Sequence, residues 1–199
     1  MFKCSACKVQ ACNNGLEKTP KNCASTEDMT EVMECYSSDE NYNFAQVAGM
    51  IAAKSDLTRI EETMLFAEIN GYRKLGIAFC ISLSKEAEVI DRIFQHNGFQ
   101  TVSVMCKAGG LSKELIGMKK SPKPMCNPIA QAKLFNKAGT DLNIIIGLCI
   151  GHDSLFIKYS EAPITVLAVK DRVLAHNPLG AVYLADTFYK SKLFPPKEK

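Results

Sequence analysis

Nine cysteines give this sequence of 199 residues its clearest chemical signal, and five of them lie within the first 35 residues. Four of these five follow the spacing Cys4-x2-Cys7-x4-Cys12-x10-Cys23. A Cys-x2-Cys pair places two sulfurs on one metal ion through a tight turn, and two further cysteines complete a tetrahedron. The spacing therefore predicts a metal site made by Cys4, Cys7, Cys12 and Cys23.

Zinc suits this N-terminal site because residues 1–35 are polar and show almost no apolar periodicity. Such a segment cannot fold by hydrophobic collapse, and metal binding would then supply its folding energy. The spacing lacks a second Cys-x2-Cys pair, so an iron–sulfur cluster is an alternative to zinc. Cys35 either replaces Cys23 as a ligand or packs.

The later cysteines lie at the expected junctions between strands and helices. Four apolar runs predict strands, namely "LGIAFCISL", "FQTVSVMC", "LNIIIGLC" and "PITVLAV". Helical patterns follow them, at 85–98, from Asn127-Pro128 to Gly139, at about 152–159 and from Asn177-Pro178 to about Lys190. This alternation predicts an α/β fold, a parallel sheet of about four strands with helices on both faces.

Parallel strands all end at one edge of the sheet, where open α/β sheets bind their ligands. Cys106 and Cys149 end the second and third predicted strands, Cys126 precedes a helix, and Cys80 lies within two or three residues of the end of the first strand. We therefore expect Cys80, Cys106, Cys126 and Cys149 to form a thiolate metal site at this edge. The alternative is that they pack as small apolar side chains.

An iron–sulfur cluster, of the [4Fe–4S] type, is the predicted cofactor of this edge site. Thiolates bind zinc as well as iron–sulfur clusters, but ligands arriving from separate strands suit the larger cluster. A helix N-terminus beside the site would favour the negative charge of a thiolate-bound cluster. His152 and His176 follow the third and fourth strands, and we predict them as proton donors. The alternatives are that Asp153, next to His152, only stabilises the first turn of its helix, and that His176 is a loop histidine in contact with solvent.

Four segments are expected along the chain: a cysteine-rich metal-binding segment at 1–35, a helical lead-in at 36–72, the α/β domain at 73–190 and a flexible tail at 191–199. The lead-in contains "NFAQVAGMIAAKS" and "DLTRIEETMLFAEINGY", both with apolar residues at helical spacing. Asp56 or Thr58 would cap the second of these helices.

The charge pattern and the apolar runs exclude several classes of partner. The net charge is +3 and basic residues never run beyond two in a row, which argues against nucleic-acid binding. No apolar run is long enough to cross a bilayer, and no secretory signal is visible, so a cytoplasmic location is expected. Thiols stay reduced there, and an odd number of cysteines favours metal or thiol chemistry over disulfides.

The chain resembles an uncharacterised bacterial and archaeal family of predicted metal-binding proteins. The resemblance lies in the N-terminal cysteine cluster, "GIAFCISL", "MCNPIAQAKLFNKAGTDLNIIIGLCIGHDSLFIKYSEAP" and "VLAVKDRVLAHNP". It implies metal binding in a cytoplasmic setting and no particular substrate.

Three functions remain open from the sequence. The first is a redox, reductase or desulfurase-type protein that acts with a redox partner or on a small-molecule substrate. The second is a zinc-stabilised binding or regulatory module, and the third is a metal carrier or sensor.

Overall fold

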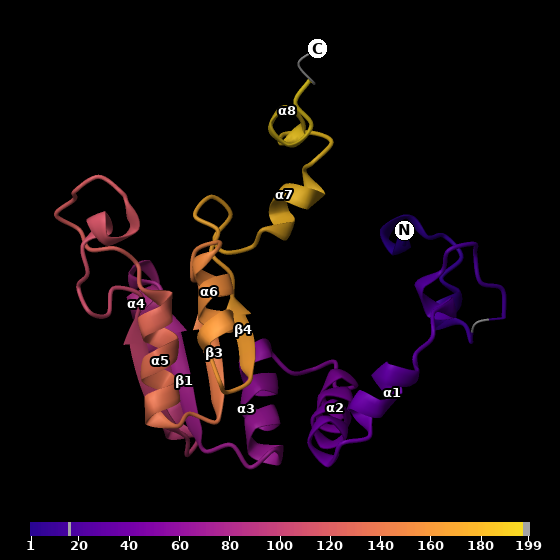
Figure 1. Ribbon diagram of the computed structural model, residues 1–199, viewed down its shortest axis with the longest axis horizontal. Coiled ribbons are helices and arrows are strands. Elements are labelled where there is room, and N and C mark those ends of the chain that lie inside the picture. Colours follow the sequence, from indigo (N-terminus) through magenta and orange to yellow (C-terminus); the bar gives the residue numbers. More distant parts are fainter. Residues whose placement is uncertain (16, 197–199) are drawn as a thin grey trace. The chain divides into compact units, whose positions relative to one another are not determined.

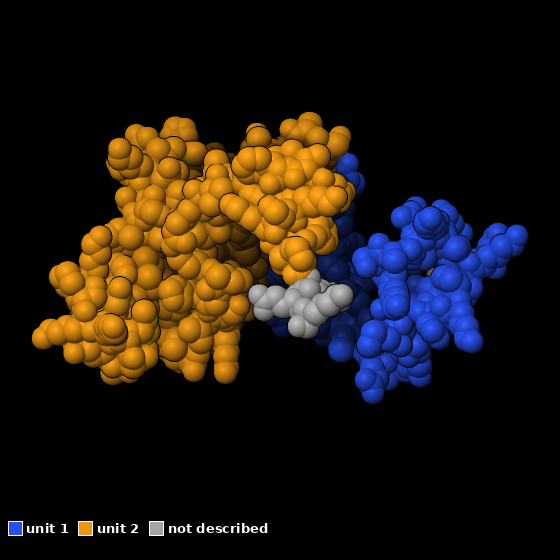
Figure 2. Space-filling model, turned by 90° about the horizontal axis from the view of Figure 1, so that it is seen from above, with its two compact units in different colours: residues 1–53 blue, residues 54–199 orange. Residues whose placement is uncertain are grey.

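The structure is a computed structural model that describes residues 1–15 and 17–196. The chain divides into two compact units, Met1–Ala53 and Lys54–Lys199, which are coloured separately in Figure 2. The boundary between them falls inside the predicted helical lead-in, so its first helix belongs to one unit and its second helix to the other. Of the predicted tail, residues 197–199 lie outside the described residues.

The first unit contains short helical turns followed by two helices. Its 3-10 turns are η1 (Cys4–Ala6), η2 (Ala11–Asn13) and η3 (Ala24–Thr26), and its helices are α1 (Thr30–Tyr36) and α2 (Asp39–Ala52). The hydroxyl of Ser38 accepts a hydrogen bond from the Asn41 amide, so α2 begins four residues before the apolar pattern suggests. Ala11, Val47 and Ile51 are the buried apolar residues of this unit, a small core for its length.

The second unit is built on a parallel sheet with the strand order β2-β1-β3-β4. Its strands are β1 (Lys74–Phe79), β2 (Gln100–Met105), β3 (Leu142–Ile146) and β4 (Ile164–Ala168), and Figure 1 shows them side by side. Every pair of neighbouring strands is parallel. The predicted α/β fold with a four-stranded parallel sheet is confirmed.

Helices cover both faces of this sheet. On one face, α3 (Arg59–Ile69) and α4 (Ser84–His96) share an apolar cluster with alternate residues of β1 and β3. On the other face, α5 (Pro128–Ala138) and α6 (His152–Tyr159) share a second cluster with the intervening strand residues, and their Phe135 and Phe156 rings meet edge to face at 5.9 Å. The central strands are therefore buried on both sides, as their continuous apolar runs predict.

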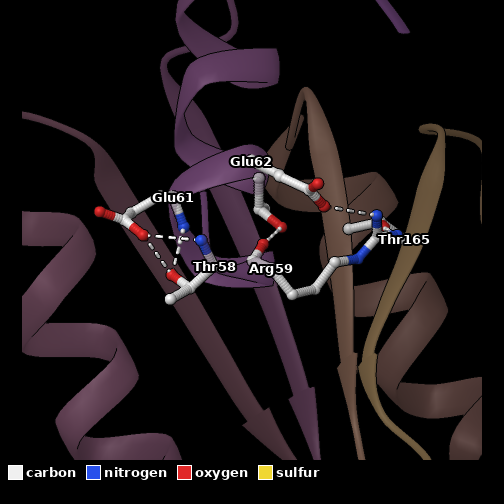
Figure 3. A network of polar contacts seen from close by, with 6 residues as sticks. Thr58, Arg59, Glu61, Glu62 and Thr165 are labelled. Atoms are coloured by element: carbon white, nitrogen blue, oxygen red, sulfur yellow. Dashed lines mark hydrogen bonds and ion pairs between the residues drawn. The ribbon is translucent and has the colours of Figure 1, made fainter. Parts of the chain in front are cut away.

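The helix α3 is fixed by its first turn. Thr58 and Glu61 form a reciprocal capping box, and Arg59 reaches from α3 to the hydroxyl of Thr165 on β4 at 2.8 Å (Figure 3). Of the two predicted caps, Thr58 is the one that the structure uses.

A glycine allows the two central strands and α5 to approach closely. A Cβ atom at Gly76 of β1 would lie 2.1 Å from Oδ1 of Asn143, which is completely buried on β3. The Asn143 side chain bonds Thr140 and Ser160, both at 2.8 Å, so it cannot move aside without breaking buried hydrogen bonds.

The C-terminal region differs from the predicted single helix at 177–190. It forms two short helices instead, α7 (Leu179–Tyr183) and α8 (Lys190–Leu193). Neither contains a buried residue, and short helices without tertiary packing are marginal in water. Within the described part of the chain, no helix combines the length and apolar character needed to cross a membrane.

Candidate thiol site at the carboxyl edge of the sheet

The backbone ladder continues one residue beyond two strands and so holds Cys80 and Cys106 at the carboxyl edge. The Cys106 amide donates to the Phe79 carbonyl at 2.9 Å, and the Cys80 amide donates to the Ile146 carbonyl at 3.2 Å. Cys80 then begins the 3-10 turn η4 (Ile81–Leu83). Strand β1 therefore ends at Phe79, and the predicted strand through Leu83 is too long.

Asn127 brings Cys126 beside Cys106 although 20 positions separate them in the sequence. Its amide donates to the Cys106 carbonyl at 2.7 Å, and its side-chain amide donates to the Ala108 carbonyl at 3.2 Å. Its side-chain oxygen caps α5 by accepting from the Ala130 amide at 3.1 Å, as the Asn-Pro start predicts. One residue thus ties the start of α5, and Cys126 with it, to the end of β2.

Gln131 of α5 holds the ends of β1 and β2 together beneath the thiols. Its side-chain amide donates to the Val104 carbonyl at 2.6 Å and to the Phe79 carbonyl at 3.3 Å, and the residue is completely buried. Its Oε1 is buried and has no hydrogen-bond partner among the described residues. This role was not predicted from the sequence. The signal for it was that Gln131 is a polar residue at a position of α5 where the i, i+3, i+4, i+7 pattern places buried side chains.

Three of the four predicted edge cysteines come together. Cys80 and Cys106 are buried in the apolar cluster under α5 and α6, and Cys126 packs against that cluster. The Cys106 sulfur accepts a hydrogen bond from the Ile81 amide at 3.4 Å. Burial raises the pKa of Cys106 to about 11; the Ile81 amide opposes this shift, and the neighbouring Cys126 and Cys80 sulfurs reinforce it.

A cationic side chain lies near each of the thiols Cys126, Cys149 and Cys80. Lys107 donates to the Cys126 sulfur at 3.3 Å, and Arg172 donates to the Cys149 sulfur at 3.1 Å. Lys170 donates to the hydroxyl of Ser82, which contacts the Cys80 sulfur at 3.4 Å. Burial alone would raise the pKa of Cys80, but the Ser82 hydrogen bonds and the Lys170 charge outweigh it and lower the pKa.

Gly147 makes room for this arrangement at the end of β3. Its φ of +61° lies in the left-handed region, and a Cβ atom there would lie 2.1 Å from Cδ1 of the buried Leu83. Lys170 passes over the same glycine on its way to Ser82. A side chain at this position would therefore push apart the loops after β1 and β4.

The remaining predicted edge residues lie further out. Cys149 is half-buried in the loop after β3, outside the apolar cluster that holds the other three thiols. His152 begins α6, and its amide donates to the Cys149 carbonyl at 2.9 Å. His176 has a φ of 65°, and its Nδ1 accepts from the Asp171 amide at 3.2 Å, which gives the ring a structural contact in its own loop.

The N-terminal cysteines form a separate group. Cys4, Cys7 and Cys23 line a cavity of about 450 Å³ in the first unit, whereas Cys12 is not part of its lining. The Gln10 amide donates to the Cys7 sulfur at 3.4 Å from a residue in the left-handed conformation. Cys35 lines a different cavity between α1 and α2.

The described side chains do not form a complete set of metal ligands. Among residues 1–15 and 17–196, no group of three or more His, Cys, Asp or Glu side chains is placed so that it could hold a metal ion. The edge thiols nevertheless lie among hydrogen-bond donors and positive charge, namely an amide, a hydroxyl and three cationic side chains.

Comparison with known proteins decides the family. Residues 20–167 match the family described as "Protein of unknown function (DUF1847)". The chain belongs to the DUF1847 family. The DUF1847 match covers all four edge cysteines and Cys23, and it begins after Cys4, Cys7 and Cys12.

A relative extends this similarity over nearly the whole chain. The uncharacterized protein MJ0455 of Methanocaldococcus jannaschii is 45% identical over 203 residues, which cover 98% of this chain and all of that protein. No solved structure matches. These matches confirm the predicted resemblance to a family of uncharacterised proteins.

Proposed function

We propose that this DUF1847 protein is a cytoplasmic iron–sulfur protein that binds its cluster through Cys80, Cys106 and Cys126 and acts in redox, reductase or desulfurase-type chemistry. The single observation that carries this proposal is that Cys80, which follows β1, lies at one edge of the sheet with Cys106 and Cys126, which flank the loop between β2 and α5. That edge includes the point between β1 and β3 where the strand order reverses, the usual ligand position in such sheets.

The charges around the thiols suit a thiolate-ligated cluster, which carries net negative charge. Lys107, Lys170 and Arg172 each contact a thiol or its hydroxyl partner. The positive ends of α4, α5 and α6 lie at the same edge, because each of these helices follows a strand. Cys106 is protonated when free, so metal binding must displace its proton, and affinity should rise with pH.

A bound cluster would supply one-electron transfer, and an iron left without a protein ligand would be open to substrate. The chain contributes the binding and proton steps. Gln131 and Asn127 orient the loops that carry the thiols, and His152 is the candidate proton donor beside Cys149. Cys149 is the candidate fourth ligand, and Arg172 donates a hydrogen bond to its sulfur.

Zinc at the N-terminal segment is a second proposal, since Cys4, Cys7 and Cys23 share one cavity. Cys12 must swing inward to complete a tetrahedral set. If the edge thiols only pack, this zinc site would make the protein a binding or regulatory module, and reversible uptake at the edge would make it a metal carrier or sensor. A redox partner or a small-molecule substrate fits the first function.

Anaerobic purification followed by iron, sulfide and zinc analysis tests the proposal. We expect wild-type protein to contain iron and acid-labile sulfide and to absorb broadly in the visible range. Cys126→Ser should lose most of that iron, whereas Cys35→Ser, an exposed cysteine of the other unit, should keep it. A colourless wild type, or equal iron in both variants, would refute the edge cluster.

A further inference from the structure

The loop that joins the two neighbouring thiols Cys106 and Cys126, residues 107–125, is fixed at its base and exposed along its body. We call it the edge loop. Lys107 donates to the Pro124 carbonyl at 2.6 Å, and the Met125 amide donates to the Leu111 carbonyl at 2.8 Å. The loop projects from the sheet edge in Figure 1, between β2 and α5. The base of the edge loop, at Lys107 and Met125, therefore adjoins both thiols.

The edge loop combines exposed apolar side chains with a concentration of positive charge. Its exposed apolar residues are Leu111, Leu115, Ile116 and Met118, with fractional exposures of 41%, 69%, 55% and 53%. It contains five lysines and one glutamate, a net charge of +4, so the other 180 residues carry a net charge of −1. Lys119, Lys120 and Lys123 are exposed beside the apolar group.

This composition fits a protein surface better than nucleic acid or a membrane. The edge loop has no arginine and no aromatic residue, the side chains that read or stack on bases. It also lacks the tryptophan or phenylalanine that anchors interfacial segments in lipid. Aliphatic side chains and a methionine beside lysines fit a contact with an acidic protein, because complementary charges steer association and fix its register.

We propose that the edge loop is the docking surface for a small acidic electron-carrier protein of the ferredoxin or flavodoxin class. The lysines attract the acidic carrier and raise its association rate, and the apolar residues form the centre of the contact. One electron then passes from the reduced carrier to the edge site, and no bond is made or broken. This electron transfer rests on the proposed function, whereas the docking itself does not.

The test measures binding of a purified ferredoxin and a purified flavodoxin, both acidic, to the full-length protein by calorimetry at low and at physiological salt. The triple variant Lys119→Gln, Lys120→Gln, Lys123→Gln removes three charges from the edge loop. Its matched control, Lys133→Gln, Lys137→Gln, Lys158→Gln, removes three exposed charges from α5 and α6. All six lysines are exposed, and thermal melts check that both variants fold.

We expect wild type and control to bind at least one carrier with salt-sensitive affinity, and the edge-loop variant to bind about tenfold more weakly. Failure of wild type to bind either carrier would overturn the docking surface, and so would equal affinity of the two triple variants. Lysine-dependent binding to phosphatidylserine vesicles but to neither carrier would overturn it in favour of lipid. Metal analysis of the same preparations reports on the cluster independently, since a carrier-binding protein without iron would refute only the proposed function.

Discussion

Raising the pH should destabilise the metal-free protein through Cys106. Burial raises the pKa of this thiol from the ordinary value of 9.0 to about 11 in the folded state. The unfolded chain therefore loses this proton first, so the contribution of Cys106 is fully present below pH 9 and declines as the pH rises toward 11. Two pH units correspond to a ceiling of about 2.7 kcal/mol, and solvent screening reduces the expected loss to about 1–2 kcal/mol.

The assay is urea unfolding of chelator-treated, reduced protein at a series of pH values from 8 to 11, with Cys106→Ser as the comparison. Serine does not ionise in this range, so the free energy of unfolding should fall more steeply with pH in wild type than in Cys106→Ser. Cys35→Ser should follow wild type, because Cys35 is exposed. Parallel pH profiles for wild type and Cys106→Ser would show that the thiol is not held protonated by burial.

Three further perturbations have defined outcomes. Gly76→Ala forces a Cβ atom onto the buried Asn143 side chain and should lower the free energy of unfolding by about 2–4 kcal/mol in urea melts; a loss below about 1 kcal/mol would contradict this close approach. Asn127→Ala should lower it by about 1–3 kcal/mol, and Asn127→Asp, which keeps the helix cap, should recover about half; equal losses would mean that the cap contributes nothing. Lys107→Met should speed amide hydrogen exchange across residues 107–125, since it unties the base of the edge loop, and unchanged exchange would argue against that tie.

The sheet could be predicted because its strands are continuous apolar runs and its helices have clear start signals. Asn127-Pro128 opens α5 where expected, and α6 occupies the expected residues. The strand order could not be predicted, because it depends on which face each crossover helix covers. The last helix was wrong because Asn177-Pro178 marks only where a helix can start, and α7 and α8 bury no residue that would stabilise a longer one.

The candidate site was predicted only in part, since sequence spacing locates strand ends but not the loops that follow them. Parallel topology places Cys80, Cys106 and Cys126 at one edge, but their convergence also depends on β1 lying next to β2 and on the hydrogen bonds of Asn127. The roles of Lys170 and Arg172 could not be predicted, because both depend on β4 lying next to β3 and on Gly147 leaving space above the sheet. Gln131 was missed for a similar reason: its partners are backbone carbonyls of two other elements.

The most direct test compares the iron and sulfide content of two multiple variants purified without oxygen. One replaces Cys80, Cys106 and Cys126 by alanine, and the other replaces Cys4, Cys7, Cys12 and Cys23. Iron and sulfide should disappear from the first and persist in the second, which should lose only zinc. Iron that survives loss of the three edge thiols, or that vanishes with the N-terminal cysteines, would contradict a cluster at the sheet edge.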